Sequence, residues 1–337
     1  MMMAASVCLS LAAQIAENID YIRFMPPKTP ENSTKWWASV IMAGPGWVVF
    51  GVAKQIMGVF LAVYVMSYLG GSEANATEPV HQFFAMYQSM MPRWLAVALA
   101  VILVVMSQIK INVTNAYSGS LAWTNAYSRM SKRHISRTAF VFLNVGISLA
   151  LMEYNMFSVL STVLGFYSNV AIAWIFIVAA DIAINKSLLK ISPVYPEFRR
   201  GMIPNFNPVG IGSLALSAAI SLAMYFGAFG SLFTAYSAMA AAIIAVVATP
   251  LIALATKGKY YRRRTHDGIE EPLFDEHGNP SNTIYTCCVT GEEVERPDVI
   301  ASAVAGPDGE KRYISSLALS LDKGGDHVLP ADLKPRG

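Results

Sequence analysis

The sequence has little charge for its length. Only 14% of the 337 residues are Asp, Glu, Lys or Arg, whereas a soluble domain carries about 25%. No charged residue stands between Asn207 and Thr256, and Glu153 is the only one between Thr138 and Ala180. A helix that crosses a bilayer needs about 20 apolar residues. The uncharged blocks therefore predict membrane spans and exclude a water-soluble fold for most of the chain.

Cysteine is also scarce, and the common catalytic motifs are missing. Cys8, Cys287 and Cys288 are too few for a disulfide framework. The five histidines are scattered, and the sequence has no Walker motif, no G-x-S-x-G and no H-E-x-x-H. No basic stripe is interleaved with aromatic residues, as nucleic-acid binding would need. We expect a membrane protein that is not an enzyme and that has no nucleic-acid partner.

What the sequence does contain is a series of apolar segments, which predicts an all-α integral membrane protein with about seven transmembrane helices. The second segment includes Gly44-Pro45-Gly46, which predicts a break or kink. The third is longer than one bilayer thickness and is expected to continue past the membrane on one side. The segments are about 4–22, 36–69, 93–128, 138–154, 157–184, 207–229 and 231–256.

Lysine and arginine gather in alternate loops. They are frequent in 23–35, 129–137, 186–200 and 257–264, and almost absent from the loops between these. Because basic loops stay on the cytoplasmic side, this pattern predicts a multi-pass protein of the cell (inner) membrane with a cytoplasmic C-terminus.

The end of the chain has a different composition. Residues 257–337 are polar, with 11 Lys or Arg against 14 Asp or Glu, and they contain several turn signals. The sequence thus predicts a transmembrane domain over 1–256 and a small cytoplasmic tail over 257–337.

The third segment carries polar side chains where a lipid-facing helix would not. Lys110, Asn112 and Asn115 lie within two turns, and each costs free energy unless it meets a partner or a water-filled cavity. One interpretation is a helix that lines a substrate or ion path. The other is a helix–helix interface held by Ser, Thr and Asn hydrogen bonds. We favour the first for Asn115 and the second for Ser118 and Ser120.

Two polar residues in other segments are also candidates. Gln14 lies deep in the first segment and is a possible site residue. Asp181 ends the fifth segment beside Asn185 and Lys186, and we expect it to cap the helix or to form an ion pair.

Several stretches resemble the nucleobase–cation symporter family, the permeases for purines, cytosine, allantoin and hydantoins. The similarity is closest to a bacterial branch described as purine–cytosine permease-like, and it covers about residues 4–262. The stretches that carry it are Asp20-Tyr21-Ile22-Arg23-Phe24, 108–125, 164–174, 207–210 and 255–261.

The resemblance implies a transporter fold of two inverted repeats of five helices followed by two further helices, with substrate bound near the bilayer midplane. In that register the chain corresponds to helices six to twelve, and the first repeat is missing. The implied function is the C-terminal half of a secondary active transporter for nucleobase-like compounds. The alternatives are a membrane sensor that signals through a cytoplasmic partner, or an inactive truncated fragment. The implied partners are a nucleobase-like small molecule, the lipid bilayer, and a missing N-terminal half or a signalling protein.

The resemblance also implies site residues. Asn115 matches the amide that hydrogen-bonds the nucleobase ring, with Gln14 and Asn112 as further substrate-binding candidates. Ile109 and Lys110 fall where sodium-coupled members place small hydroxylated ligands of the cation. We therefore expect Lys110 to take the place of the coupling ion, or else to pair with an acid from a neighbouring helix.

The tail resembles a cysteine-rich module of the same branch in degenerate form. Cys287 remains, Thr290 stands at the position of its partner, and 314–322 replaces a cysteine-rich run. Structural zinc needs four thiolate or imidazole ligands, so the sequence predicts no metal and no cofactor.

Overall fold

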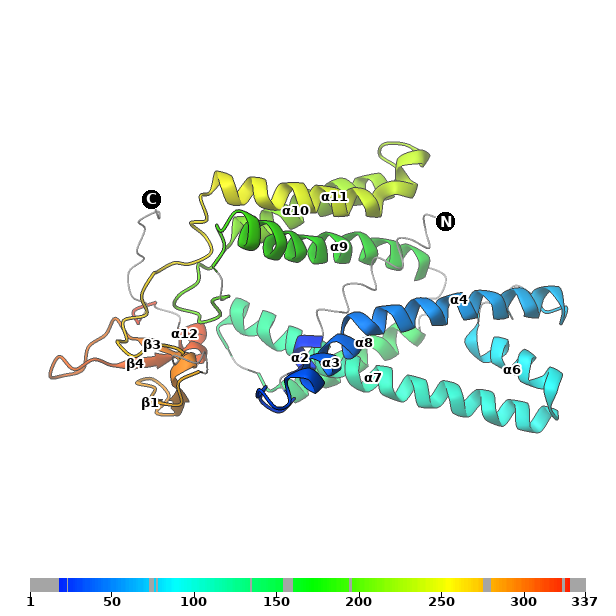
Figure 1. Cartoon of the computed structure of the whole chain (residues 1–337), viewed down its shortest axis with the longest axis horizontal. Coiled ribbons are helices and arrows are strands. Elements are labelled where there is room, and N and C mark those ends of the chain that lie inside the picture. Colours follow the sequence, from blue (N-terminus) through cyan, green and yellow to red (C-terminus); the bar gives the residue numbers. More distant parts are fainter. Residues whose placement is uncertain are drawn as a thin grey trace. The chain divides into compact units, whose positions relative to one another are not determined.

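The computed structural model describes residues 18–22, 24–72, 76, 78–133, 135–153, 160–193, 196–274, 280–322 and 325–327 (Figure 1). The chain is mostly helical, at 64%, with little sheet. The expected all-α class therefore holds for the apolar part of the chain and is wrong for the tail, which contains two short antiparallel strand pairs. The first expected span, 4–22, lies largely outside the described residues and is represented by helix α2 (Asn18–Ile22). A shorter apolar helix covers Arg137–Leu151. Five described helices are long and apolar enough to cross a membrane: Ser33–Ser67, Arg93–Ser131, Val163–Leu188, Pro208–Tyr225 and Ser231–Ala255.

The chain divides into two compact units. One comprises Leu11–Ala122 and Arg137–Tyr154, and the other comprises Met1–Ser10, Trp123–Ser136 and Asn155–Gly337. The long helix α7 (Arg93–Ser131) contributes to both.

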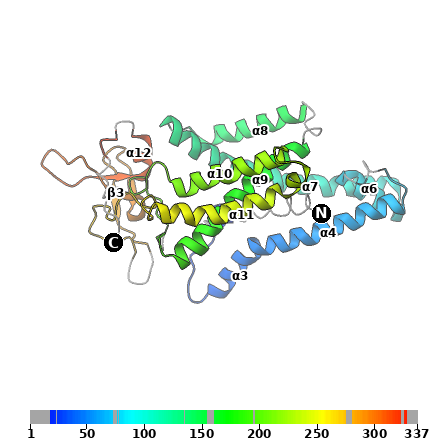
Figure 2. The same cartoon turned by 90° about the horizontal axis from the view of Figure 1, so that it is seen from above.

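In the first of these units, the predicted break in the second apolar segment is present. Helix α3 (Ser33–Ala43) is followed by its C-cap residue Gly44, and α4 (Pro45–Ser67) begins at Pro45, which has no N–H to continue the hydrogen-bond ladder (Figure 2). Gly44 also allows α2 to approach closely, because a β-carbon there would lie 2.7 Å from Nδ2 of Asn18.

The same unit continues through α6 (Pro79–Met90), α7 and α8 (Arg137–Glu153). Gln82 of α6 donates from Nε2 to the carbonyl of Gly58 in α4 at 3.1 Å. At 39 residues, α7 is about 58 Å long, nearly twice the thickness of the hydrocarbon core. This length agrees with a helix that continues past the membrane. Helix α8 packs on α7 where Asn144 contacts Gly119.

The other unit is built on α9 (Leu160–Ala180), α10 (Pro208–Tyr225) and α11 (Ser231–Ala255), which lie side by side in both views (Figures 1 and 2). Small residues let these helices pack closely. Ser217 of α10 is fully buried and donates to the carbonyl of Ala241 in α11 at 2.7 Å. Gly230, at φ +94, ends the tight turn between α10 and α11 and is the N-cap residue of α11.

Helix α9 does not end at Ala180 but continues as the π-helix η3 (Asp181–Leu188). Such helices are rare and often occur at functional sites.

The tail folds into a small β-domain. Strands β1 (Ile284–Thr286) and β2 (Glu293–Glu295) form one antiparallel pair, and β3 (Val299–Ala301) and β4 (Tyr313–Ser315) form another. The short helices η4 (Arg296–Asp298) and α12 (Ser316–Leu321) complete it. The main core consists of Met202, Cys287, Ile300, Ile314, Ala318 and Leu319.

Candidate functional site

The predicted site residues on α7 are partly visible. Asn112 lies at the middle of this helix, and Asn115 follows one turn later; both side chains are exposed. The backbone of Lys110 belongs to the same helix, but its side chain lies outside the described residues, as does the whole of Gln14. The structure thus places three of the four candidates, Lys110, Asn112 and Asn115, on one stretch of helix.

The second interpretation of α7, a helix–helix interface, is confirmed around Ser118 and Ser120. The hydroxyl of Tyr21 in α2 lies 3.3 Å from Oγ of Ser118 and 3.5 Å from the carbonyl of Thr114. Ser120 is fully buried and donates to the carbonyl of Tyr117 at 2.7 Å. Ser118 and Ser120 therefore have the packing role that was expected of them.

The π-helix η3 forms a polar node with the segment that follows α11. Asn185 is fully buried and donates from Nδ2 to Asp181 Oδ1 and to the hydroxyl of Tyr261, both at 2.9 Å. The Tyr261 hydroxyl in turn donates to Asp181 Oδ1. Burial and the hydrogen bond to Asp181 raise the pKa of Tyr261 above its usual range. Asp181 therefore binds an amide and a phenol, and this node joins η3 to the start of the tail.

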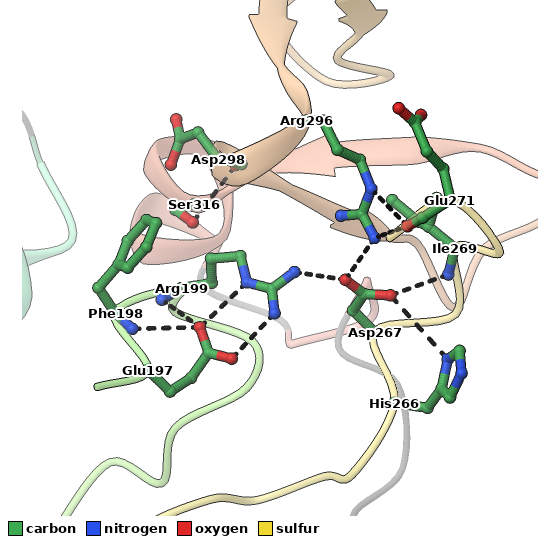
Figure 3. A network of polar contacts seen from close by, with 10 residues as sticks. All are labelled: Glu197, Phe198, Arg199, His266, Asp267, Ile269, Glu271, Arg296, Asp298 and Ser316. Carbon is green, nitrogen blue, oxygen red and sulfur yellow. Dashed lines mark hydrogen bonds and ion pairs between the residues drawn. The ribbon is translucent and has the colours of Figure 1, made fainter. Parts of the chain in front are cut away.

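A second and larger network lies in the tail domain (Figure 3). Arg199 belongs to the loop between η3 and α10. Its guanidinium group donates from Nε to Glu197 Oε1 at 3.0 Å, from Nη2 to Glu197 Oε2 at 2.9 Å, and from Nη1 to Asp267 Oδ2. The guanidinium group of Arg199 thus binds two carboxylates, Glu197 and Asp267, which are distant from each other in the sequence.

Asp267 is the centre of this network. It is 6% exposed, and its Oδ2 also accepts from Arg296 Nη2 at 2.9 Å, while Oδ1 accepts from the Ile269 amide at 3.0 Å. Arg296 is 1% exposed and donates from Nε to the carbonyl of Glu271 at 3.0 Å. One buried carboxylate therefore binds two buried guanidinium groups.

The charges in the network stabilise each other. Burial alone would raise the pKa of Asp267, but hydrogen bonds from Arg199, Ile269 and Arg296 outweigh it and hold that pKa below its usual range. Burial would likewise raise the pKa of Glu197, and the hydrogen bonds and charge of Arg199 lower it. Both carboxylates are therefore ionised at neutral pH.

The loop that carries Arg199 is part of the tail domain's core. Met202 packs among the buried residues of the β-domain, and its carbonyl accepts from the Arg263 amide at 2.7 Å. Gly201 has no room for a side chain, because a β-carbon there would collide with Ile300. The loop between η3 and α10 is thus fastened to the tail by charge, packing and a backbone hydrogen bond.

Cys287 occupies a tight turn between β1 and β2. Gly291, at φ +71, donates from its amide to the Cys287 carbonyl at 2.8 Å. Burial raises the pKa of the thiol, but hydrogen bonds from the Thr290 side chain and from the backbone amides of Ser315, Thr290 and Val289 lower it to about 7. The Ser315 amide lies 3.5 Å from the sulfur. Among the described residues, no three His, Cys, Asp or Glu side chains are grouped so that they could hold a metal ion.

The ion network was not foreseen from the sequence. Arg199, Asp267 and Arg296 are separated by long intervals, and nothing in their local pattern distinguishes them from ordinary surface charges. The sequence contains one weak indication that the loop before α10 and the start of the tail could meet. Charged residues stand on either side of α10 and α11, at Glu197-Phe198-Arg199-Arg200 and at the three arginines 262–264.

Comparisons of the chain with protein-family models, with curated proteins and with solved structures find no match.

Proposed function

We propose that the chain forms the C-terminal half of a secondary active transporter for nucleobase-like compounds such as purines, cytosine or allantoin. The observation that carries this proposal is the pair of exposed amides, Asn112 and Asn115, near the middle of a helix that is apolar and long enough to cross a membrane. Amides in hydrocarbon need polar partners. This part of α7 would therefore face a polar cavity rather than lipid.

The chemistry of the side chain supports a nucleobase-like ligand. An amide donates and accepts hydrogen bonds at the same time, and the edge of a nucleobase offers both. The broken helix α3–α4 and the π-helix η3 add irregular backbone at two apolar spans, and irregular spans are typical of transporters that bind small molecules between repeats. The remaining wall of the cavity would come from the first repeat.

The test is uptake of radiolabelled cytosine, uracil, purine and allantoin by cells that express the protein from its own locus. Asn115→Ala should lower uptake of the transported compound at least about tenfold, which is a loss of about 1.4 kcal/mol of interaction. Asn125→Ala is the matched control, because it removes the same side chain from the same helix near its end, and uptake should stay unchanged. If deletion of the locus leaves all four uptakes unchanged, the proposal is wrong.

A complementary test uses residues 1–337 alone, purified and reconstituted. Uptake should stay at background, because a site between two repeats cannot form from one. Saturable uptake by this chain alone would contradict its assignment as half of a transporter.

We also propose that Lys110 takes the place of the coupling cation. A fixed ammonium group would repel sodium strongly in a site of low dielectric, and a buried lysine can titrate near neutral pH. Uptake by the complete transporter should then be independent of sodium, and Lys110→Ala should remove any proton dependence. Sodium-stimulated substrate binding with Lys110 intact would contradict this.

A sensor function is the second candidate, and the tail favours it. The loop between η3 and α10 is held in the tail domain by Arg199, Asp267 and Met202, so a movement of the helices on either side of the loop would reach the tail. A sensor predicts that ligand changes hydrogen exchange in residues 196–204 and 267–301 while no ligand is taken up. Uptake without such a change would favour the transporter.

A further inference from the structure

Two segments at the ends of the α9–α11 helices bring arginines together. Residues 262–264 are three consecutive arginines, and the loop before α10 contains Arg199 and Arg200. The hydrogen bond from the Arg263 amide to the Met202 carbonyl, at 2.7 Å, holds the two segments side by side. Arg199 binds both Glu197 and Asp267.

Arg200, unlike Arg199, donates to a neutral side chain and not to a carboxylate. Its Nη2 donates to the amide oxygen of Asn205 at 2.7 Å, which is a neutral acceptor. Burial lowers the pKa of Arg200, and the charges of Arg129, near the end of α7, and Arg263 lower it further. The Nε and Nη1 atoms of Arg264 are buried and have no hydrogen-bond partner among the described residues. The hydrogen bond between Arg263 and Met202 brings the segments of Arg200 and Arg263 together, and neighbouring cations favour the binding of an anion.

The position of these arginines along the chain indicates where that anion would be. Arg200 lies in the loop between the end of η3 at Leu188 and the start of α10 at Pro208, and Arg263 lies eight residues after the end of α11 at Ala255, so both arginines belong to segments that connect to apolar spans. Phe198 and Phe206 lie in the same loop as Arg200 and are 60% and 55% exposed. Figure 3 shows the Phe198 ring turned away from the ion network. Exposed apolar rings beside basic residues are a pattern of segments that lie at the membrane–water interface.

We propose that Arg200 and Arg263 bind the phosphate of an anionic phospholipid headgroup in the inner leaflet. Guanidinium groups bind phosphate oxygens in pairs of hydrogen bonds, and basic pockets at the cytoplasmic ends of membrane helices bind such headgroups. The exposed rings of Phe198 and Phe206 would lie against the acyl-chain boundary. A bound lipid would thereby contact the loop that the tail domain holds. The site is independent of any transported compound.

The experiment is native mass spectrometry of the full chain in detergent micelles supplemented with phosphatidylglycerol or phosphatidylcholine. The wild-type chain should retain phosphatidylglycerol in preference to phosphatidylcholine. The double variant Arg200→Gln, Arg263→Gln should retain at least about fivefold less phosphatidylglycerol, a difference of about 1 kcal/mol by the same conversion. The matched control is the double variant Lys311→Gln, Arg312→Gln. It also removes two positive charges from the tail, including that of Lys311, which pairs with Glu270. This variant should retain as much phosphatidylglycerol as the wild-type chain.

Three results would overturn the proposal. Equal retention of the two lipids by the wild-type chain would show that the headgroup charge is not recognised. Unchanged retention by the Arg200 and Arg263 double variant would show that the site lies elsewhere. Displacement of the lipid by inorganic phosphate at the same concentration would assign the site to a free anion. If the double variant does not fold, the test is the salt dependence of the wild-type chain. Its retention of phosphatidylglycerol should fall as the sodium chloride concentration is raised. Retention that does not depend on salt would contradict the proposal.

Discussion

Replacement of Asp267 by alanine should release the loop between η3 and α10 from the tail domain. The side chains of Arg199 and Arg296 are 3% and 2% exposed, and both bind this carboxylate. Removal of one partner from a buried ion pair costs about 3–5 kcal/mol, because a buried charge is left uncompensated. Glu197 still binds Arg199 in the variant, so we expect the lower end, about 3 kcal/mol.

Hydrogen–deuterium exchange of the full chain measures this loss where it occurs. The Ile269 amide donates to Asp267 Oδ1, and the Ala301 amide donates to the Asp267 carbonyl, each at 3.0 Å. A loss of about 3 kcal/mol should speed exchange in 196–204 and 267–301 by about 100-fold, if exchange proceeds through local opening. Asp267→Asn keeps an oxygen for the Ile269 amide and should have an intermediate effect. The control Asp308→Ala changes an exposed carboxylate in the same domain. If exchange in Asp267→Ala stays within twofold of wild type, the network does not hold the loop.

The same carboxylates predict how the tail responds to pH. The folded-state pKa values of Glu197 and Asp267 lie below their usual values, which are about 4.3 and 3.9 in an unfolded chain. A depressed folded pKa stabilises the fold fully above the unfolded value, and this stability is lost as pH falls through the folded value. Protection of 267–301, corrected for intrinsic exchange rates, should therefore be constant above about pH 5 and fall below about pH 4. Asp267→Ala should reduce this fall, and an equal fall in the variant would contradict the assignment.

Three further predictions concern other parts of the chain. Tyr261→Phe removes the hydroxyl that bonds Asp181 and Asn185 and should cost about 1–3 kcal/mol in thermal unfolding; Tyr260→Phe should cost much less, and equal effects would contradict the role of the node. Gly201→Ala places a methyl group against a buried isoleucine of β3 and should loosen the loop by about 1–3 kcal/mol, measured by exchange in 196–204; unchanged exchange would show that the site can repack. Reporter fusions after Gly71 should be outside the cell and those after Lys190 inside; a cytoplasmic Gly71 would overturn the predicted topology.

The sequence alone determined the helical architecture and several of its details. Long uncharged runs must be buried in lipid or protein, so their length and number predict apolar helices, and five described helices are long enough to cross a membrane. The break at Gly44-Pro45 was predictable because proline lacks the N–H that a continuous helix needs. Packing at Ser118 and Ser120 was expected because small hydroxylated residues let helices approach closely.

The tertiary structure alone decided which distant charges meet. Arg199, Asp267 and Arg296 are unremarkable in the sequence, and they form one buried network because the loop before α10 packs into the tail domain. The π-helix after Ala180 was likewise not predictable, since its contacts with Tyr261 depend on a segment that lies 76 residues beyond Asn185. The pattern of apolar and charged residues along a short stretch of sequence indicates whether that stretch prefers water or lipid. The partner of a buried charge is set by how segments far apart in the chain pack against each other, because a Coulomb interaction in a low dielectric depends on distance in space and not along the chain.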